Sequence, residues 1–229
     1  LSNVPFKITS VNTGEWHIMM TDANGVLSTA ANQHSHLTNE NDRAYSDGTL
    51  DVSALKADAG IWFSGTKDAS TVVSANDSLG ALPYDTYTIE ELQGTSNQGK
   101  RLISFDVTID EADDIKDHGV VENHDLPSIK TLFTNGGYSQ TIAANKTYQL
   151  TDRIEVINLE KGHHYTLNGY VYAIKGNQKI DDNKYIASKT IDFTAEDTTY
   201  TCEMPFEVNT SELGGHTLLA CQYLTENGK

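Results

Sequence analysis

The chain has few basic residues, few cysteines and no long apolar run. Its 229 residues include 16 Lys and Arg against 32 Asp and Glu, which gives a formal net charge of −16. Nucleic acid and anionic membrane surfaces would repel such a chain, so we expect neither as a partner. Two cysteines are too few for a small disulfide scaffold. No apolar stretch reaches the roughly 18 residues that a membrane-spanning helix needs, so we expect no membrane insertion within this chain.

Short runs rich in Val, Ile, Thr, Tyr and Phe alternate with turn residues along the whole chain. Runs of this kind, separated by Asn-Gly, Asp-Gly and Gly-Gly pairs, are typical of β-sandwiches. Only residues 52–59 have the apolar spacing of a helical turn. The candidate strands are 6–9, 16–20, 61–63, 86–89, 102–109, 165–174, 185–193, 199–208 and 217–224. The sequence therefore predicts an all-β fold of two tandem, Ig-like or prealbumin-like β-sandwich domains.

The chain is long enough for two domains that each bury a core of their own. A polar stretch at 110–117 precedes Val120-Val121, which has the character of a closing strand, and Pro127 restarts the chain. We therefore place the boundary near 124–127, with domains at 1–124 and 125–229.

The second domain carries several motifs in a fixed order. Residues 127–131 read Pro-Ser-Ile-Lys-Thr, residues 148–152 read Tyr-Gln-Leu-Thr-Asp, and further matching segments lie at 159–169 and 215–224. Over 127–229 these motifs resemble the T-Q ester-bond (VaFE-type) repeat of Gram-positive surface proteins. In that family a strand threonine attacks a glutamine side chain, and the resulting ester bond locks the domain.

The resemblance assigns roles to three residues of the second domain. Thr131 matches the ester-forming threonine and Asp152 an assisting acid, whereas Gln222 stands where the family usually has a glutamate. A threonine hydroxyl is a poor nucleophile and must be relieved of its proton, and a carboxylic acid can help ammonia to leave the amide. The family's acceptor glutamine would follow Lys229, so the resemblance implies that the last strand and the ester partner are absent from this chain. An ordinary strand threonine and a surface aspartate are the alternative interpretation.

The first domain resembles the Cna-B/SpaA-type prealbumin-like domains, through segments at 4–10, 21–25, 34–42, 60–63 and 80–92 in the family's order. Many such domains carry an isopeptide bond between a lysine and an asparagine or aspartate, assisted by a buried glutamate. The resemblance makes Glu91 the candidate acid and Asn123 a candidate amide partner. The reactive lysine would precede Leu1, together with the family's first strand, and Lys7 does not align with it. In the alternative interpretation, Lys7 and Glu91 are ordinary strand residues that face solvent.

His34 and His36, with Asp42 and Asp47, are the nearest approach to a metal-binding pattern. Two histidines in a polar, Asn-rich loop are more often solvated than bound to metal, and no third ligand follows at fixed spacing. We therefore expect no metal and no cofactor.

The two cysteines, Cys202 and Cys221, fall symmetrically about a turn near Leu213. We expect them to lie opposite each other on one hairpin, where two packed core thiols are favoured over a disulfide.

These observations favour a non-enzymatic structural stalk module of a cell-wall-anchored bacterial adhesin or pilus-like protein. Its expected location is extracellular, at the cell wall, and its expected partners are neighbouring domains of the same surface protein. The alternative is a module that binds a host ligand or glycan through the long loop 30–58. A hydrolase has little support, because no Gly-x-Ser-x-Gly or His-Glu-x-x-His motif occurs.

Overall fold

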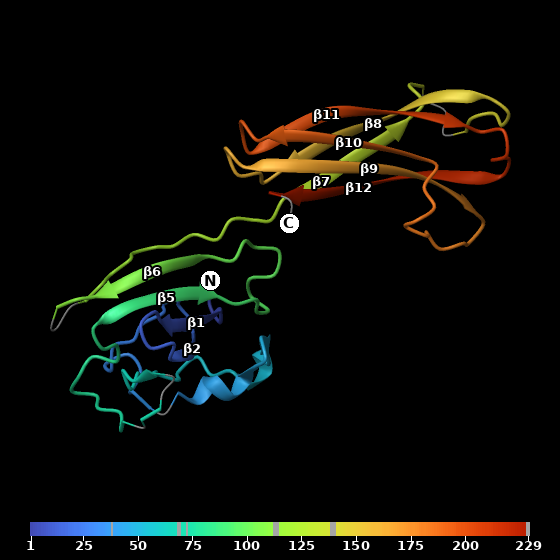
Figure 1. Ribbon diagram of the computed structural model, residues 1–229. Helices are drawn as coiled ribbons and strands as arrows, with labels where there is room; N and C mark the ends of the chain where they lie inside the picture. Colours follow the sequence, from blue (N-terminus) through green and yellow to red (C-terminus); the bar gives the residue numbers. More distant parts are fainter. Residues whose placement is uncertain (38, 68–69, 72, 112–114, 138–140, 228–229) are drawn as a thin grey trace. The chain divides into compact units, whose positions relative to one another are not determined.

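The computed structural model describes residues 1–37, 39–67, 70–71, 73–111, 115–137 and 141–227 (Figure 1). The chain forms two compact units, Leu1–Asp125 and Leu126–Lys229. Strands dominate both units, and the described helices are short 3-10 turns, so the predicted all-β class is confirmed. None of these helices is long and apolar enough to cross a membrane.

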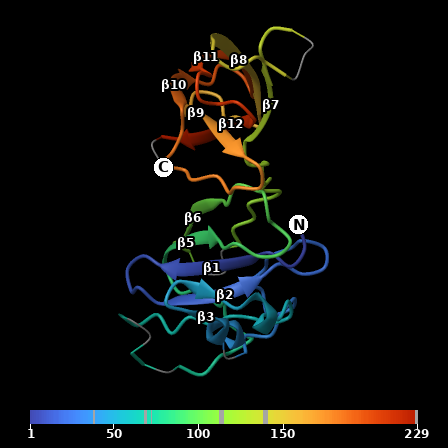
Figure 2. The same cartoon turned by 90° about the vertical axis from the view of Figure 1, so that its right-hand side faces the viewer.

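The first unit is built on one antiparallel four-stranded sheet in the order β2-β1-β5-β6 (Figure 2). Apolar side chains at alternate positions of β1 and β5, such as Ile8, Tyr87 and Ile89, are buried on one face of this sheet. The remaining chain includes a two-stranded hairpin and two 3-10 helices. The elements are β1 Pro5–Ser10, β2 Trp16–Met20, η1 Glu40–Ala44, β3 Tyr45–Ser46, β4 Thr49–Leu50, η2 Val52–Ala54, β5 Asp85–Glu91 and β6 Ser104–Ile109.

Three sequence expectations in this unit have different outcomes. The helical turn predicted within 52–59 is present as η2, over Val52–Ala54. The strand predicted at 61–63 is wrong, because this segment is irregular although Ile61 and Phe63 are fully packed in the core. The closing strand predicted around Val120 is also wrong, because no described strand pairs with it and Val120 is 90% exposed.

The second unit consists of two three-stranded antiparallel sheets, ordered β10-β9-β12 and β11-β8-β7. Inward side chains alternate along the long central strands β8 and β9, and those of Ile154, Val156, Leu167 and Val171 form one core between the sheets. The strands are β7 Ser128–Thr134, β8 Thr147–Ile157, β9 His164–Lys175, β10 Ala187–Thr194, β11 Thr199–Asn209 and β12 His216–Glu226.

The cysteines do not share a hairpin, so that expectation is wrong. β11 pairs with β8 and β12 pairs with β9, because the chain passes from one sheet to the other between them. Cys202 packs against the core, whereas Cys221 lies on the outer face of its sheet, since its neighbours Ala220 and Gln222 point inward. Both thiols are free, and the core-thiol expectation holds for Cys202 alone.

Candidate functional site

Three side chains that the sequence singled out come together inside the second unit. Thr131 lies on β7, Asp152 on β8 and Gln222 on β12, so three strands from both sheets contribute one residue each. Asp152 stands directly opposite Phe133 of β7, one inward position away from Thr131. Gln222 stands opposite Gly169 of β9. The sheet pairing therefore brings together residues that are 91 positions apart in the sequence.

Asp152 is fully buried and is contacted from both sides. The Nε2 of Gln222 donates a hydrogen bond to Oδ2 of Asp152. Burial raises the pKa of the Asp152 carboxyl, and the Gln222 amide, the Thr131 hydroxyl and the Leu132 backbone N–H offset part of that rise. The surface-aspartate interpretation is therefore wrong, because the side chain is a buried acid that faces the other two members of the cluster.

Two buried oxygen atoms of this cluster have no hydrogen-bond partner among the described residues. They are Oδ1 of Asp152 and Oε1 of Gln222. A buried acceptor without a partner costs about 1–3 kcal/mol, so the folded unit keeps this arrangement at the expense of stability. Such a cost is expected where polar groups are held for chemistry rather than for packing.

Thr131 points inward and is nevertheless exposed. It alternates with Ile129 and Phe133, which pack against the core, so its hydroxyl is on the inner face of β7. β7 is the edge of one sheet and β12 the edge of the other, and the two edges approach each other (Figures 1 and 2). The hydroxyl is therefore accessible from solvent on one side and faces the buried carboxyl of Asp152 on the other.

Residues 127–229 match the family model of the T-Q ester bond containing domain. The second unit is a T-Q ester bond domain. The resemblance inferred from the sequence is thereby confirmed for this part of the chain. The Cna-B/SpaA likeness of the first unit stays a prediction.

No curated protein matches the chain. Among solved structures, a bacterial adhesin from Mobiluncus mulieris containing intramolecular disulfide, isopeptide and ester bond cross-links is 17% identical, with a TM-score of 0.33, over 44% of this chain and 45% of that one. The full-length major pilin SpaD from Corynebacterium diphtheriae is 16% identical, with a TM-score of 0.34, over 99% of this chain and 60% of that one. The chain thus covers less than two thirds of the length of either protein.

A second buried acid lies in the unit that precedes the T-Q domain. Glu91 is 3% exposed at the end of β5, so the interpretation of this residue as solvent-facing is wrong. Its Oε1 accepts from Nδ2 of Asn97 (2.8 Å), and its Oε2 accepts from the backbone N–H of Ile103 (3.0 Å) and from Nδ2 of Asn123 (2.6 Å). The structure thus brings together Glu91 and Asn123, which the sequence proposed as acid and amide.

Lys7 takes no part in this cluster, because its Nζ lies over the rings of Trp16 and Tyr45, 5.7 and 5.5 Å from their centroids. Sequence reasoning missed Asn97, which is fully buried. No local pattern marks this asparagine, which lies in the connection between β5 and β6.

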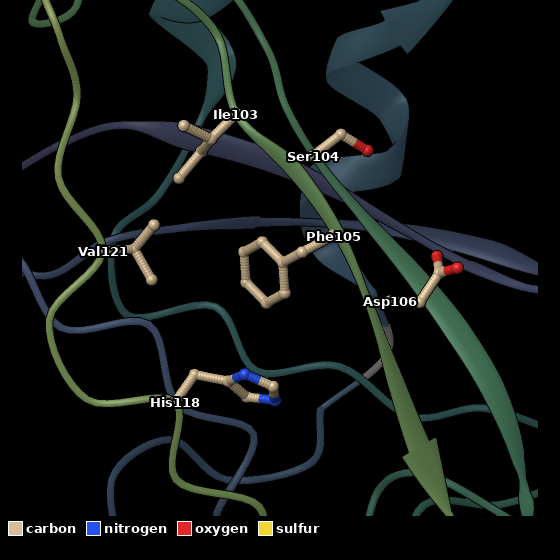
Figure 3. Close-up of a pocket in the computed structure, with 6 residues that line it drawn as sticks. All are labelled: Ile103, Ser104, Phe105, Asp106, His118 and Val121. Carbon is tan, nitrogen blue, oxygen red and sulfur yellow. The ribbon is translucent and has the colours of Figure 1, made fainter.

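A shallow apolar hollow of about 450 Å³ lies beside β6 in the first unit. Phe105 forms its floor and His118 packs on that ring, with ring centroids 5.2 Å apart (Figure 3). Val121 and Ile103 close two of its sides. Among the described residues, Asp106 and His118 are the titratable groups that line the hollow.

His36, one of the two histidines considered for metal binding, has other contacts. His36 is buried, and its Nε2 and Nδ1 face the backbone carbonyls of Thr29 (2.9 Å) and Asn76 (3.3 Å). Asp42 instead accepts from the backbone N–H of Ile18 and contacts Nδ1 of His17 (2.7 Å). These contacts hold the loop after β2 against the sheet.

In the T-Q domain, His163 lies between two carboxylates. Its Nδ1 contacts Glu226 and its Nε2 lies 3.2 Å from Glu160, and the three form the metal-type group found among the described residues. One ring nitrogen of His163 and one oxygen of each carboxylate lie within 4.8 Å of one another, and all three side chains are half-buried. The geometry fits an imidazole that bridges the 160–163 turn and the end of β12.

The long loop 30–58, which carries the alternative ligand-binding hypothesis, is largely fixed in place. Asn41 and Lys56 exchange two hydrogen bonds of 2.9 Å across it. Its aromatic residue, Tyr45, packs edge-on against Trp16, with 5.4 Å between ring centroids. The ring is therefore engaged with the sheet through Trp16.

Proposed function

We propose that the chain is a structural stalk module of a bacterial cell-surface adhesin or pilus-like protein. It is linked to neighbouring domains of the same protein, which is anchored to the cell wall, and it is not an enzyme. Within the T-Q domain, a self-formed covalent bond from Thr131 fastens β7 and makes the domain resistant to pulling. The family match over 127–229 and the all-β architecture support this proposal.

One observation carries the proposal: a buried acid that is contacted by a strand hydroxyl and by a carboxamide. A structural core would be more stable with apolar side chains at these three positions, because buried polar groups are costly unless they are fully hydrogen-bonded. Thr131, Asp152 and Gln222 instead supply a nucleophile, a proton acceptor and an amide. These three groups are suited to a single reaction within one molecule rather than to repeated catalysis, because the nucleophile and the amide that it attacks belong to the same domain.

A covalent bond between strands has a mechanical consequence that can be measured directly. Without a cross-link, pulling residues 126–229 open would release 104 residues, or about 360 Å of chain at roughly 3.5 Å per residue. With a cross-link from Thr131, the residues between the bonded positions stay in a closed loop and release no length.

The test is single-molecule extension of the full-length parent protein, as wild type and as Thr131→Val. We expect a release of about 360 Å from residues 126–229 alone in the variant and a much shorter one in the wild type. Thr190→Val is the matched control, since the Thr190 hydroxyl bonds Asn168 on the outer face and lies away from Asp152. Full-length release from the wild type would contradict the proposal.

A further inference from the structure

We infer that Glu160, His163 and Glu226 form a binding site for a divalent transition-metal ion of the zinc type. The site lies where the turn between β8 and β9 meets the end of β12. The proposed function uses none of these three residues, so the site would add a second, reversible connection to the T-Q domain.

The three side chains offer ligand atoms that already converge. His163 supplies a ring nitrogen and each glutamate supplies one carboxylate oxygen, and these atoms lie within 4.8 Å of one another. Tetrahedral zinc, with bonds of about 2.0–2.2 Å, holds its ligand atoms about 3.4 Å apart. The ligands therefore have to close by no more than about 1.4 Å. All three side chains are half-buried, so the solvent side leaves room for that movement.

The backbone that carries two of the ligands is fixed by hydrogen bonds. The His163 N–H donates to the carbonyl of Glu160 (3.1 Å) and closes the turn, which Gly162 permits with a φ of +83°. Ala195 holds the turn from the side, because its carbonyl accepts from the Gly162 N–H (2.8 Å) and its N–H donates to the carbonyl of His163 (2.9 Å). The Glu160 N–H in turn donates to the hydroxyl of Tyr165 (2.9 Å).

The third ligand is carried by the neighbouring strand. Glu226 of β12 stands opposite Tyr165 of β9 in the antiparallel ladder. The next residue, Asn227, donates its N–H to the carbonyl of His164 (2.9 Å). Both sides of the site are thus tied to the same strand, and an ion has to order only side-chain torsions. A scaffold held in this way lowers the entropy cost of binding.

Charge favours a dication at this position. Two carboxylates flank one imidazole, whose Nδ1 contacts Glu226 and whose Nε2 lies 3.2 Å from Glu160. In the metal-free protein, the ring bridges the two acids. A dication bound to one ring nitrogen and to both carboxylates neutralises their two negative charges directly, in a chain with a formal net charge of −16.

The ligand set selects the class of metal. An imidazole together with carboxylates suits zinc and similar transition metals, whereas calcium and magnesium prefer oxygen ligands alone. Three protein ligands leave a fourth position for water on the exposed side. Glu226 is 63 positions from His163, so no local sequence pattern marks the site. The bound ion would fasten the connection between the two sheets to the end of β12.

The experiment is isothermal titration calorimetry of zinc chloride into the 229-residue chain after treatment with EDTA and its removal. We expect saturable binding of zinc that His163→Gln and Glu226→Gln each weaken by at least about tenfold. His164→Gln is the matched control, because this exposed neighbouring histidine lies outside the cluster and should leave the affinity unchanged. Calcium chloride should give no binding that depends on His163.

Hydrogen exchange of the same proteins supplies a structural readout. Zinc should slow exchange of the Gly162 and Asn227 amides, which adjoin the ligands, in the wild type but not in His163→Gln. Equal zinc affinity in the wild type and His163→Gln would place the ion at another histidine or cysteine and overturn the inference. The absence of saturable zinc binding, or zinc binding without a change in these two amides, would overturn it as well.

Discussion

Replacing Gly169 with alanine tests whether the T-Q domain core holds Gln222 as tightly as the geometry indicates. The added β-carbon would lie 2.3 Å from Sδ of Met204, 2.6 Å from Oε1 of Gln222 and 2.9 Å from Cζ of Phe206. Ordinary contacts between such atoms are about 3.5–4.0 Å, so all three side chains must move. Met204 is fully buried and Phe206 is 2% exposed, so neither can yield toward solvent.

The expected loss of stability is about 3 kcal/mol. Extra carbon atoms in a well-packed core typically cost 1–3 kcal/mol, and three simultaneous close contacts place Gly169→Ala at the upper end. For a domain of about 100 residues, 1 kcal/mol lowers the melting temperature by roughly 4–8 °C, so we expect a drop of about 12–24 °C. The comparison is made in the Thr131→Val background, where no ester from Thr131 contributes to stability.

The assay is calorimetry with tryptophan fluorescence recorded in parallel. Both tryptophans, Trp16 and Trp62, belong to the first unit, so their fluorescence follows that unit alone. The T-Q transition should move while the tryptophan transition stays in place. Gly214→Ala is the matched control, because its β-carbon would meet only Ala144, at 4.0 Å. A loss below about 0.5 kcal/mol for Gly169→Ala would refute the close packing on which the position of Gln222 depends.

The strand pattern was predictable because side chains alternate between core and solvent. Tyr165, Leu167 and Val171 are buried at alternate positions of β9, and the sequence shows the same alternation. The same reasoning could have found the burial of Glu91, since Tyr87, Ile89 and Glu91 share one face of β5. The resemblance to Cna-B domains implied a buried acid at Glu91, and only the alternative interpretation had this residue face solvent.

Sheet pairing was not predictable from local pattern. The segments around Cys202 and Cys221 look like a hairpin, because a short turn joins them, yet β11 and β12 belong to different sheets. Likewise, Ile61 and Phe63 have the composition of a strand but fill the core without one. Local propensity predicts whether a segment can form a strand, but the strand with which it pairs depends on residues far away in the sequence.

The candidate site was only partly predictable for the same reason. Sequence motifs singled out Thr131, Asp152 and Gln222 individually, but treated Gln222 as an altered acid. Only the pairing of β12 with β9, and the approach of β12 to β7, shows that its carboxamide shares a carboxylate with Thr131.

Two further perturbations address the two buried acids. Glu91→Ala leaves the Asn97 and Asn123 amides and the Ile103 N–H without their acceptor, so the first unit should lose about 3 kcal/mol in urea unfolding followed by tryptophan fluorescence. Glu90→Ala, on the opposite face of β5, should change it by less than about 0.5 kcal/mol, and equal losses would contradict the role of Glu91. For Asp152, burial raises the folded-state pKa above the unfolded value of 3.8, so the folded domain binds the proton more tightly. Protonation of Asp152 therefore stabilises the folded domain. This stabilisation is complete below pH 3.8 and is lost as the pH rises through the folded-state pKa. The measurement is the free energy of unfolding as a function of pH for Thr131→Val and for Thr131→Val with Asp152→Asn. The Asp152→Asn change should remove the decline with rising pH. Parallel curves for the two variants would show that Asp152 titrates as an ordinary exposed acid.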